Sequence, residues 1–316
     1  MIAEKEIHRT SVKFETVVCP ICGSSEKTSC YEFSDTFGSY SLVSCKSCNM
    51  NYLNPRPTYD TIGVYYDSSN YTPFLSSGKK ENLFNRVYRS VRNYSVAWKR
   101  RKIEKFIMKG SVLDIGCGTG EFLNEMRANG WAVMGLEPSE DASEFARREL
   151  KLDVMTGFID ETFAHSIHAN FDVITLWHVL EHVHEPKEAL TLIAKKMADA
   201  GLLMIAVPNI ASLDARIYRK DWIALDVPRH LLHFAPETME KLVKESGMMI
   251  IKKHQMPLDT VFNSLMSEIR VIRRSPKWLL PLFLIRLSVT IICSWFNGIR
   301  ENRGSSVMYY IRKKKN

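Results

Sequence analysis

The sequence has few of the features that mark fibrous, disordered or disulfide-stabilised chains. Glycine (15) and proline (12) are sparse among its 316 residues, of which 45% are hydrophobic and 25% charged. This composition excludes collagen, coiled coils and extended disorder, and the length suits one large domain or two small ones. The seven cysteines are odd in number and too few for a disulfide scaffold. The first residues are polar where a signal peptide would be apolar, so we expect reduced thiols and a cytoplasmic protein.

Basic and acidic residues are distributed unevenly along the chain. The net charge is +8, yet residues 110–251 carry a net −9, whereas residues 79–109 carry +9 and residues 252–316 carry +10. This segregation disfavours a uniformly basic protein that coats nucleic acid. It favours an acidic centre with basic flanks, which would meet an anionic membrane surface or a phosphate-bearing small substrate.

Four of the cysteines form two C-x-x-C pairs, and the other three are scattered. The pairs are Cys19–Cys22 and Cys45–Cys48, with 22 residues between them. Each pair turns two thiolates toward one point, so the four sulfurs can hold a tetrahedral Zn²⁺ with no open position. Such a site is structural, because a segment of about 40 residues cannot bury enough apolar surface alone. We expect a zinc ribbon over residues 1–57, ending at the stiff stretch 54–57.

From residue 111 the sequence alternates between short apolar runs and longer amphipathic ones. Such alternation predicts an α/β fold, with a mostly parallel sheet and helices on both of its faces. Strands are expected at 111–116, 131–137, 153–157, 171–177, 201–208, 248–254 and 306–313. Helices are expected at 121–129, 140–150, 185–199 and 236–246.

Two segments stand outside this alternation. Residues 58–109 read as a connector (58–78) followed by a basic amphipathic helix (82–109), whose charges either form a solvated face or meet headgroups, a pyrophosphate or RNA. Residues 278–296 are nearly all apolar, are interrupted by Pro281 and Arg286, and lie between basic clusters. Three alternatives remain for this run: a buried or dimer-forming helical insertion, an interfacial membrane segment, or a transmembrane helix. The last is disfavoured because the final strand must return to the same sheet.

A glycine-rich turn follows the first predicted strand of the sheet. In Asp114-Ile-Gly116-Cys-Gly118-Thr-Gly120, the glycines allow a tight turn and close approach of a ligand, and the helix N-terminus attracts negative charge. Glu137 ends the next strand, where a carboxylate can accept both ribose hydroxyls of an adenosine. The G-x-G-x-G spacing differs from the dinucleotide fingerprint, which disfavours a nicotinamide-dependent oxidoreductase.

With its ordered motifs DIGCGTG, GLEPS, FDVIT and LEHV, the chain resembles the class I S-adenosylmethionine-dependent methyltransferases over about residues 110–251. The resemblance implies a Rossmann-like sheet with an antiparallel last strand. It implies that the glycine turn passes under the methionine part of the cofactor, that Glu137 holds the ribose, and that Asp114 orients the turn or the cofactor's amino group. Phe158 would flank the adenine and Trp177 would pack against the cofactor. The implied cofactor set is Asp114, Gly116, Cys117, Gly118, Gly120, Glu137, Pro138, Phe158 and Trp177.

The cysteine pairs before such a domain resemble one branch of the family, in which a zinc ribbon precedes a methyltransferase that acts on sugars, lipid-linked intermediates or other natural products. We therefore expect four parts. These are the ribbon (1–57), the linker and basic helix (58–109), the cofactor-binding domain (110–257 with 306–316), and an apolar and basic helical insertion (258–305).

A cluster of histidines and a glutamate follows the fourth predicted strand, at the edge where such sheets bind ligands. His178, Glu181 and His182 lie there, and His230 and His233 come later. A neutral histidine can draw the proton from an acceptor hydroxyl, and His182 or His230 is the predicted base. The residues His178, Glu181 and His182 also resemble an E-x-x-E-H pattern that binds a divalent metal in the ubiquinone-pathway and small-RNA-terminal O-methyltransferases. Here His178 replaces the first glutamate.

Three roles therefore stay open for Glu181 and His182: lining the site without a metal, binding a second divalent metal together with His178, or a structural role. For His230 and His233, a catalytic or substrate-binding role competes with a structural one. We expect His184 at the surface.

The sequence as a whole predicts a methyltransferase that uses S-adenosylmethionine and a structural zinc. The expected acceptor is a hydroxyl or carbon of a small molecule, such as a sugar, a lipid-linked glycan or a related metabolite. We expect a location in the cytoplasm or at the inner face of the membrane, with membrane contact through residues 278–296. The alternatives are an RNA methyltransferase that grips phosphates with the ribbon and the basic helix, and a module that binds the cofactor without turnover.

Overall fold

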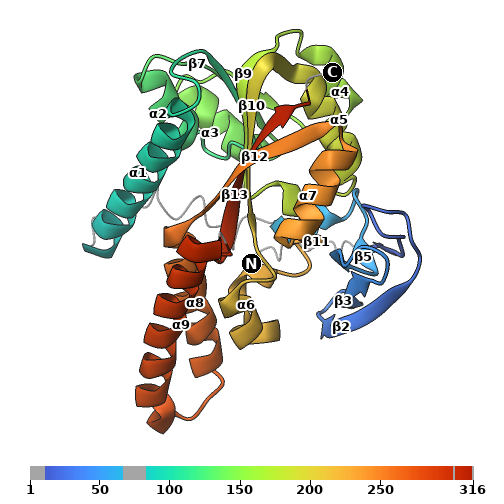
Figure 1. Cartoon of the computed structure of the whole chain (residues 1–316), viewed down its shortest axis with the longest axis vertical. Coiled ribbons are helices and arrows are strands. Elements are labelled where there is room, and N and C mark those ends of the chain that lie inside the picture. The colour runs from blue at the N-terminus through green and yellow to red at the C-terminus, as the bar shows by residue number, and fades with distance from the viewer. Residues whose placement is uncertain (1–10, 67–82, 302, 315–316) are drawn as a thin grey trace, which may run out of the picture.

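The computed structural model describes residues 11–66, 83–301 and 303–314. The second half of the predicted connector, residues 67–78, and the first predicted helical residue, 82, lie outside these ranges. The described parts comprise a seven-stranded sheet with helices packed along it, a small four-stranded sheet near the N-terminus, and a pair of long helices that extends away from the large sheet (Figure 1).

The large sheet has the strand order β12-β13-β10-β9-β6-β7-β8. Strands β6 to β10 run parallel, whereas β13 is antiparallel to both β10 and β12. This confirms the predicted mostly parallel sheet with an antiparallel last strand. The strands are β6 (Ser111–Ile115), β7 (Ala132–Glu137), β8 (Val154–Thr156), β9 (Phe171–Trp177), β10 (Met197–Pro208), β12 (Met248–Gln255) and β13 (Ser306–Lys313).

Helices cover both faces of this sheet, as predicted. Helices α1 (Leu83–Glu104), α2 (Glu121–Ala128) and α3 (Glu140–Glu149) contribute to one buried cluster with side chains such as Ile103, Phe122 and Ala146. Helices α4 (Glu161–Ser166), α5 (Pro186–Lys196) and α7 (Pro236–Glu245) contribute to the other, with Phe163 and Leu242 among its members. The two apolar layers fix the sheet edge from which the glycine turn projects.

Several element boundaries differ from the sequence prediction, among them the ends of two helices. Helix α1 ends at Glu104 rather than 109, because the carbonyl of Ile103 accepts from the amides of Phe106 and Ile107 in a closing turn. Helix α5 ends at Lys196 rather than 199, because Met197 is buried and pairs with Phe171 as the first residue of β10.

The N-terminal segment folds as short strands that connect to the large domain. The strands are β1 (Phe14–Glu15), β2 (Lys27–Ser34), β3 (Ser39–Cys45), β4 (Asn51–Leu53) and β5 (Arg56–Pro57). A strand from the large domain, β11 (Leu232–His233), extends this small sheet by pairing with β4, so that Leu232 lies opposite Tyr52 and His233 opposite Asn51. Backbone hydrogen bonds therefore join the two parts.

A buried arginine makes a second connection between them. Arg56 pairs with Glu15 (2.7 Å) and Glu185 (3.0 Å), and it donates to the carbonyl of His184 (2.8 Å). His184 donates in turn from Nε2 to the carbonyl of Pro57 (3.1 Å) and is only 9% exposed. The expectation that His184 lies at the surface was wrong, because the N-terminal segment covers it.

Between β12 and β13 the chain forms a helical hairpin of α8 (Pro257–Ile272) and α9 (Leu280–Glu301). The two helices pack against each other and against the short helix α6 (Leu213–Tyr218), and they extend beyond the large sheet (Figure 1). The predicted apolar run 278–296 thus lies mostly in α9. The division of the chain into four parts stays a prediction.

Candidate functional site

The turn after β6 contains three glycines in the left-handed backbone region. Their φ values are +69° at Gly116, +56° at Gly118 and +85° at Gly120. A Cβ atom at Gly116 would lie 2.4 Å from Val179, and one at Gly120 would lie 2.5 Å from Leu152. At Gly118, by contrast, a Cβ would meet no atom within 4 Å. The first and third glycines thus permit close packing, while the second leaves the backbone open to a ligand.

Glu137, at the end of β7, is buried and bonded to this turn. Its Oε2 accepts from the amide of Gly118 (2.7 Å), and its Oε1 accepts from the amide of Ser139 (3.0 Å). Burial raises the pKa of Glu137, and these two amide bonds oppose that effect. Each carboxylate oxygen still has acceptor capacity. The side chain is therefore held beside Gly118 in an orientation suited to accept hydroxyl donors.

Asp114 is the second-last residue of β6, just before the turn, and it is also buried. Its Oδ1 accepts from the hydroxyl of Thr175 on the neighbouring β9 (2.5 Å). Burial raises the pKa of Asp114 to about 7, against the opposing effect of Lys99. The ammonium of Lys99 lies 4.5 Å from the ring centroid of Trp177, whose indole N–H is buried and has no hydrogen-bond partner among the described residues. A cation, two carboxylates and an aromatic ring thus surround the edge of the turn.

The remaining residues of the predicted cofactor set lie around the same strand ends. Cys117 is buried beneath the turn, and Pro138 is exposed beyond β7. Phe158 is half-exposed, and its ring centroid lies 5.1 Å from that of Tyr59 in the segment after β5. The predicted cofactor residues therefore lie together at the edge of the sheet where β6, β7, β8 and β9 end.

Glu181 and two histidines converge next to this edge. One ligand atom each from Glu181, His182 and His230 lie within 4.8 Å of one another. Glu181 is fully buried, and neither of its oxygens has a hydrogen-bond partner among the described residues; the nearest cationic group is Nδ1 of His178, 3.4 Å from Oε1. An unsatisfied buried carboxylate is costly, so this position is suited to a proton donor or a cation.

In both histidine rings Nδ1 bonds to a backbone carbonyl, which leaves Nε2 of His182 as an acceptor, whereas Nε2 of His230 lies 3.8 Å from Oδ2 of Asp226. His182 donates from Nδ1 to the carbonyl of Arg229 (3.0 Å) and lies 2.8 Å from the hydroxyl of Tyr66. His230 donates from Nδ1 to the carbonyl of Ala224 (2.9 Å). Burial, assisted by His230, lowers the pKa of His182 to about 4. His182 is therefore neutral near pH 7 and can accept a proton or bind a metal ion.

His178 lies between Glu181 and an acidic residue of α8. It adopts a left-handed backbone (φ +58°), and its Nε2 lies 2.9 Å from Oδ2 of Asp259 in the first turn of α8. Burial alone would lower the pKa of His178, but Asp259 and Glu181 raise it to about 10. A charged His178 is a poor base and a poor metal ligand. The structure brings His230, rather than His178, into the group with Glu181 and His182.

The last predicted histidine faces the N-terminal segment. The ring of His233 lies 6.3 Å from that of His230, and its Nε2 is buried without a hydrogen-bond partner among the described residues. Burial lowers the pKa of His233 to about 3. Sequence reasoning missed Lys99 and Asp259, because they come from α1 and α8, far in the chain from every motif.

The four paired cysteines gather in the N-terminal segment. The Sγ atoms of Cys19 and Cys48 are 3.4 Å apart, those of Cys22 and Cys45 are 3.5 Å apart, and all four lie within 4.8 Å. Tetrahedral Zn²⁺ with Zn–S bonds of about 2.3 Å places its sulfurs about 3.8 Å apart. Burial raises the pKa of Cys19 and Cys48, whereas the amides of Cys48 and Ser47 lower the pKa of Cys45 to about 7. The cluster fits a structural zinc site.

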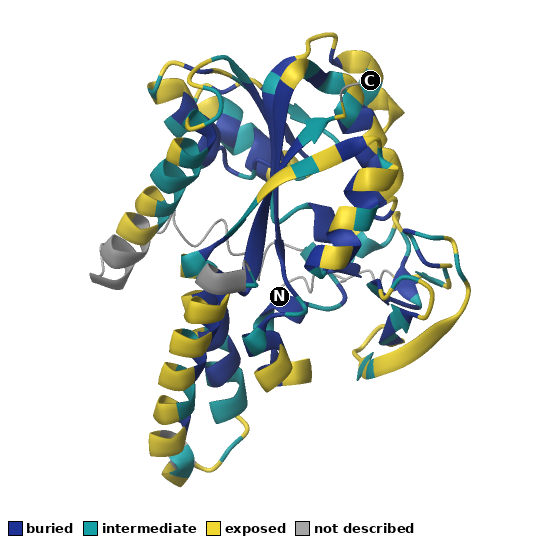
Figure 2. Ribbon diagram, in the orientation of Figure 1, coloured by how far each residue is buried: buried dark blue, intermediate teal, exposed yellow. Residues whose placement is uncertain are grey.

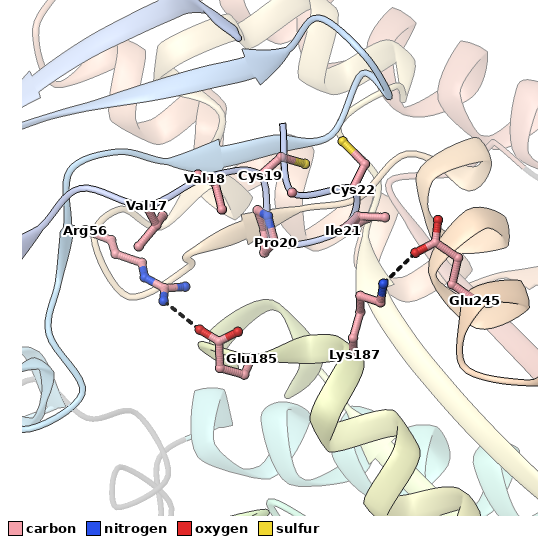
Figure 3. A pocket seen from close by; sticks show the side chains of 11 residues that line it. Val17, Val18, Cys19, Pro20, Ile21, Cys22, Arg56, Glu185, Lys187 and Glu245 are labelled. Atoms are coloured by element: carbon pink, nitrogen blue, oxygen red, sulfur yellow. Dashed lines mark hydrogen bonds and ion pairs between the residues drawn. The ribbon is translucent and has the colours of Figure 1, made fainter. Parts of the chain in front are cut away.

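Beside these cysteines a hollow of about 620 Å³ separates the segment from α5 and α7 (Figure 3). Its charged groups neutralise one another, since Arg56 pairs with Glu185 and Lys187 pairs with Glu245 (2.8 Å). The hollow therefore belongs to the junction between the two parts and offers no free charge to a ligand.

Comparison with known proteins adds to this geometry. A family model described as a methyltransferase domain matches residues 85–253. The ubiquinone biosynthesis O-methyltransferases of Schizosaccharomyces pombe (mitochondrial) and Vibrio atlanticus are 28% and 29% identical to the chain over 152 and 131 residues, covering 46% and 40% of it. The chain spans about half the length of these relatives, 53% and 52%.

A solved structure resembles the fold. The magnesium protoporphyrin IX methyltransferase of Synechocystis PCC 6803, with S-adenosylhomocysteine bound, superposes with a TM-score of 0.52 at 14% identity. The match covers 81% of this chain and all of that one.

Proposed function

The chain belongs to the methyltransferase domain family, and from that premise we propose that it transfers a methyl group from S-adenosylmethionine to a hydroxyl of a small molecule. The observation that carries the proposal is the hydrogen bond from the amide of Gly118 to Glu137 (2.7 Å), which places a buried carboxylate beside the open glycine of the turn. Bound S-adenosylmethionine supplies an electrophilic methyl group on a sulfonium.

Different residues around the turn bind different parts of this cofactor. Glu137 accepts the ribose hydroxyls, and the exposed faces of Phe158 and Pro138 flank the adenine. Gly116, Gly118 and Gly120 let the backbone approach the methionine part. Asp114 and the face of Trp177 attract its positive charge.

On the acceptor side, the proposed base is His182 or His230. Both rings direct Nδ1 to a backbone carbonyl, so each can receive the acceptor's proton at Nε2. Positioning and one base suffice for an in-line displacement. Oε2 of Glu181, which has no hydrogen-bond partner among the described residues, supports a second candidate, in which Glu181, His182 and His230 would hold a divalent metal that would lower the pKa of the acceptor hydroxyl.

The names of the relatives support oxygen as the accepting atom, since both are O-methyltransferases of ubiquinone biosynthesis. Within small molecules we retain a sugar, a lipid-linked glycan or a related metabolite as the acceptor class, with a carbon acceptor as the alternative. An RNA acceptor and a module without turnover remain the rival proposals. We also propose that Cys19, Cys22, Cys45 and Cys48 bind a structural zinc.

Two matched variants test the cofactor site. Gly118→Asp and Gly247→Asp both place a side chain at a glycine of positive φ, +56° and +73°, where nothing lies within 4 Å. Calorimetry should find that only Gly118→Asp loses affinity for S-adenosylmethionine. Equal affinities in the two variants would refute the site.

Transfer of labelled methyl into fractionated cell extract, followed by identification of the product, then tests the acceptor. A labelled small molecule is expected. Label in RNA would favour the first rival, and binding of S-adenosylmethionine without any labelled product would favour the second.

A further inference from the structure

The outward face of α9 is apolar between Leu282 and Phe296. Figure 2 colours much of this helix as exposed, and the exposed side chains recur at the three- and four-residue spacing of one helical face. They include Leu282, Ile285, Val289, Ile292 and Phe296. Ile285 is 62% exposed and Phe296 is 64% exposed. Scattered exposed apolar residues are ordinary, but a continuous stripe of this kind marks an interaction surface.

The inner face of the same hairpin is more polar than its outer face. The buried residues of α9 include Thr290, Ser294 and Gly298, together with one large apolar side chain, Phe283. Arg286 reaches inward to Glu268, which is 1% exposed, with a closest approach of 2.8 Å. On α8 the buried residues are Thr260, Asn263, Ser264, Ser267 and Glu268, whereas Leu258, Val261, Phe262 and Leu265 are exposed.

This pattern reverses the usual arrangement of a helix on a water-soluble protein. Small and polar residues at the contact between helices, with apolar residues outside, are the arrangement that suits a lipid environment. Residues Pro281–Gly298 also form a stretch that is long and apolar enough to cross a membrane, and only 22% of it is buried. The described strand β13 returns directly to the large sheet, which favours a hairpin lying in the membrane surface over one that crosses it.

Basic side chains lie at the end of α8 and on the neighbouring α6. Arg273 is exposed where α8 ends, and Arg274 beside it pairs with Asp221 (2.8 Å). A hollow of about 540 Å³ beside the hairpin is lined by Asp221 and by the exposed Arg216, Arg219 and Lys220. Residues 252–316 carry 13 basic and 3 acidic side chains. A second copy of the chain docking on this face would bring like charges together, whereas anionic headgroups would neutralise them.

We propose that the α8–α9 hairpin docks the protein on an anionic lipid bilayer, with the outward face of α9 among the acyl chains and the basic side chains at the end of α8 and on α6 at the lipid phosphates. The hairpin then acts as an interfacial anchor, held by apolar burial and by charge together. This inference goes beyond the proposed function and does not depend on methyl transfer.

Flotation of the whole chain tests the anchor. The protein is mixed with vesicles of phosphatidylcholine and phosphatidylglycerol, and with vesicles of phosphatidylcholine alone. The double variant Ile285→Ser/Ile292→Ser removes two side chains that are 62% and 52% exposed, so the fold is retained. It should lower partitioning onto the anionic vesicles at least about tenfold. The matched control Val91→Ser/Met108→Ser removes exposed apolar side chains elsewhere and should bind like the wild type.

A second pair of measurements addresses charge and the competing occupant. Arg219→Gln/Arg273→Gln should weaken binding to the anionic vesicles about tenfold or more and leave the weaker binding to neutral vesicles unchanged. The proposal fails if the folded wild-type chain does not float with anionic vesicles. It also fails if the wild type is a dimer without lipid and Ile285→Ser/Ile292→Ser makes it a monomer. Neither result bears on methyl transfer, which the cofactor variants test separately.

Discussion

Oδ2 of Asp259 lies 2.9 Å from Nε2 of His178, so the first residues of the α8–α9 hairpin contact the edge of the sheet where the glycine turn and Glu181 lie. His178 also lies 3.4 Å from Glu181. The imidazolium of His178 thus stands between two carboxylates, one from the hairpin and one from the candidate site. The base of the hairpin is part of the site's electrostatics.

We expect Asp259→Asn to destabilise the protein most at mildly acidic pH. The pKa of His178 is about 10 in the fold, above the ordinary value of 6.5. The ion pair therefore stabilises fully below about pH 6.5 and loses its effect as the pH rises through 10. Denaturant unfolding at pH 6, 8 and 10 should show a wild-type advantage that shrinks with pH, and Asp153→Asn at an exposed carboxyl should show none. An advantage that grows with pH would contradict the pairing.

Asp114→Asn should stabilise the cofactor-free protein above neutral pH while it abolishes cofactor binding. Burial raises the pKa of Asp114 to about 7, so its ionised form is costly in the fold. The cost is absent below about pH 4 and grows until pH 7, where it reaches up to about 4 kcal/mol. Asparagine keeps an acceptor for Thr175 without the charge. Urea unfolding at pH 5 and pH 8 measures the difference, and a variant less stable than the wild type at pH 8 would contradict the prediction.

Replacing His182 should reduce turnover without loosening the cofactor. His182→Asn removes the neutral Nε2 acceptor, so kcat should fall by about 10² to 10⁴ while the Kd of S-adenosylmethionine stays unchanged. Because the pKa of His182 is about 4, its ionisation should leave the rate flat between pH 6 and pH 8. His165→Asn, at an exposed histidine, is the matched control. An unchanged kcat would leave His230 as the predicted base.

A separate measurement tests whether Glu181, His182 and His230 bind a metal ion that the reaction requires. In the metal-free arrangement, dialysis against a mild chelator that leaves the ribbon zinc bound should not change the rate, and added Mg²⁺ or Mn²⁺ should not raise it. A rate that falls on dialysis and is restored by a divalent ion in the wild type, but not in Glu181→Gln, would instead assign Glu181, His182 and His230 as ligands.

Cys45→Ser/Cys48→Ser should abolish zinc binding and lower the melting temperature. Zinc binding contributes directly to the folding free energy of such small segments, so a loss of several kcal/mol is expected. Elemental analysis should find about one zinc per chain in the wild type and none in the variant. Cys30→Ser, at an exposed cysteine outside the cluster, should keep both the zinc and the melting temperature. Full zinc content in the double variant would refute the site.

Local patterns were enough to predict the seven strands of the large sheet, the glycine turn and the cysteine pairs, because each depends on residues close in the chain, whereas the short helices α4 and α6 were not predicted. The contacts of Lys99 and Asp259, the pairing of β11 with β4 and the burial of His184 depend on tertiary packing, so no local pattern indicated them. The apolar character of residues 278–296 was evident from the sequence, but the sequence did not indicate which face of α9 would pack against the rest of the protein. The answer depended on the polar side chains of α8 that α9 covers.

The position of β13 has a consequence for how the chain is made. In the described sheet order β12 has β13 as its neighbour, and β13 in turn separates β12 from β10. During synthesis β12 can pair with β13 only after residues 306–313 have left the ribosome, and the whole hairpin emerges before them. During that interval the apolar stripe of α9 is already in solution while the sheet edge at β10 is still open. A nascent chain at this stage is the form most exposed to aggregation, and early capture of the hairpin by a membrane surface would shorten that stage.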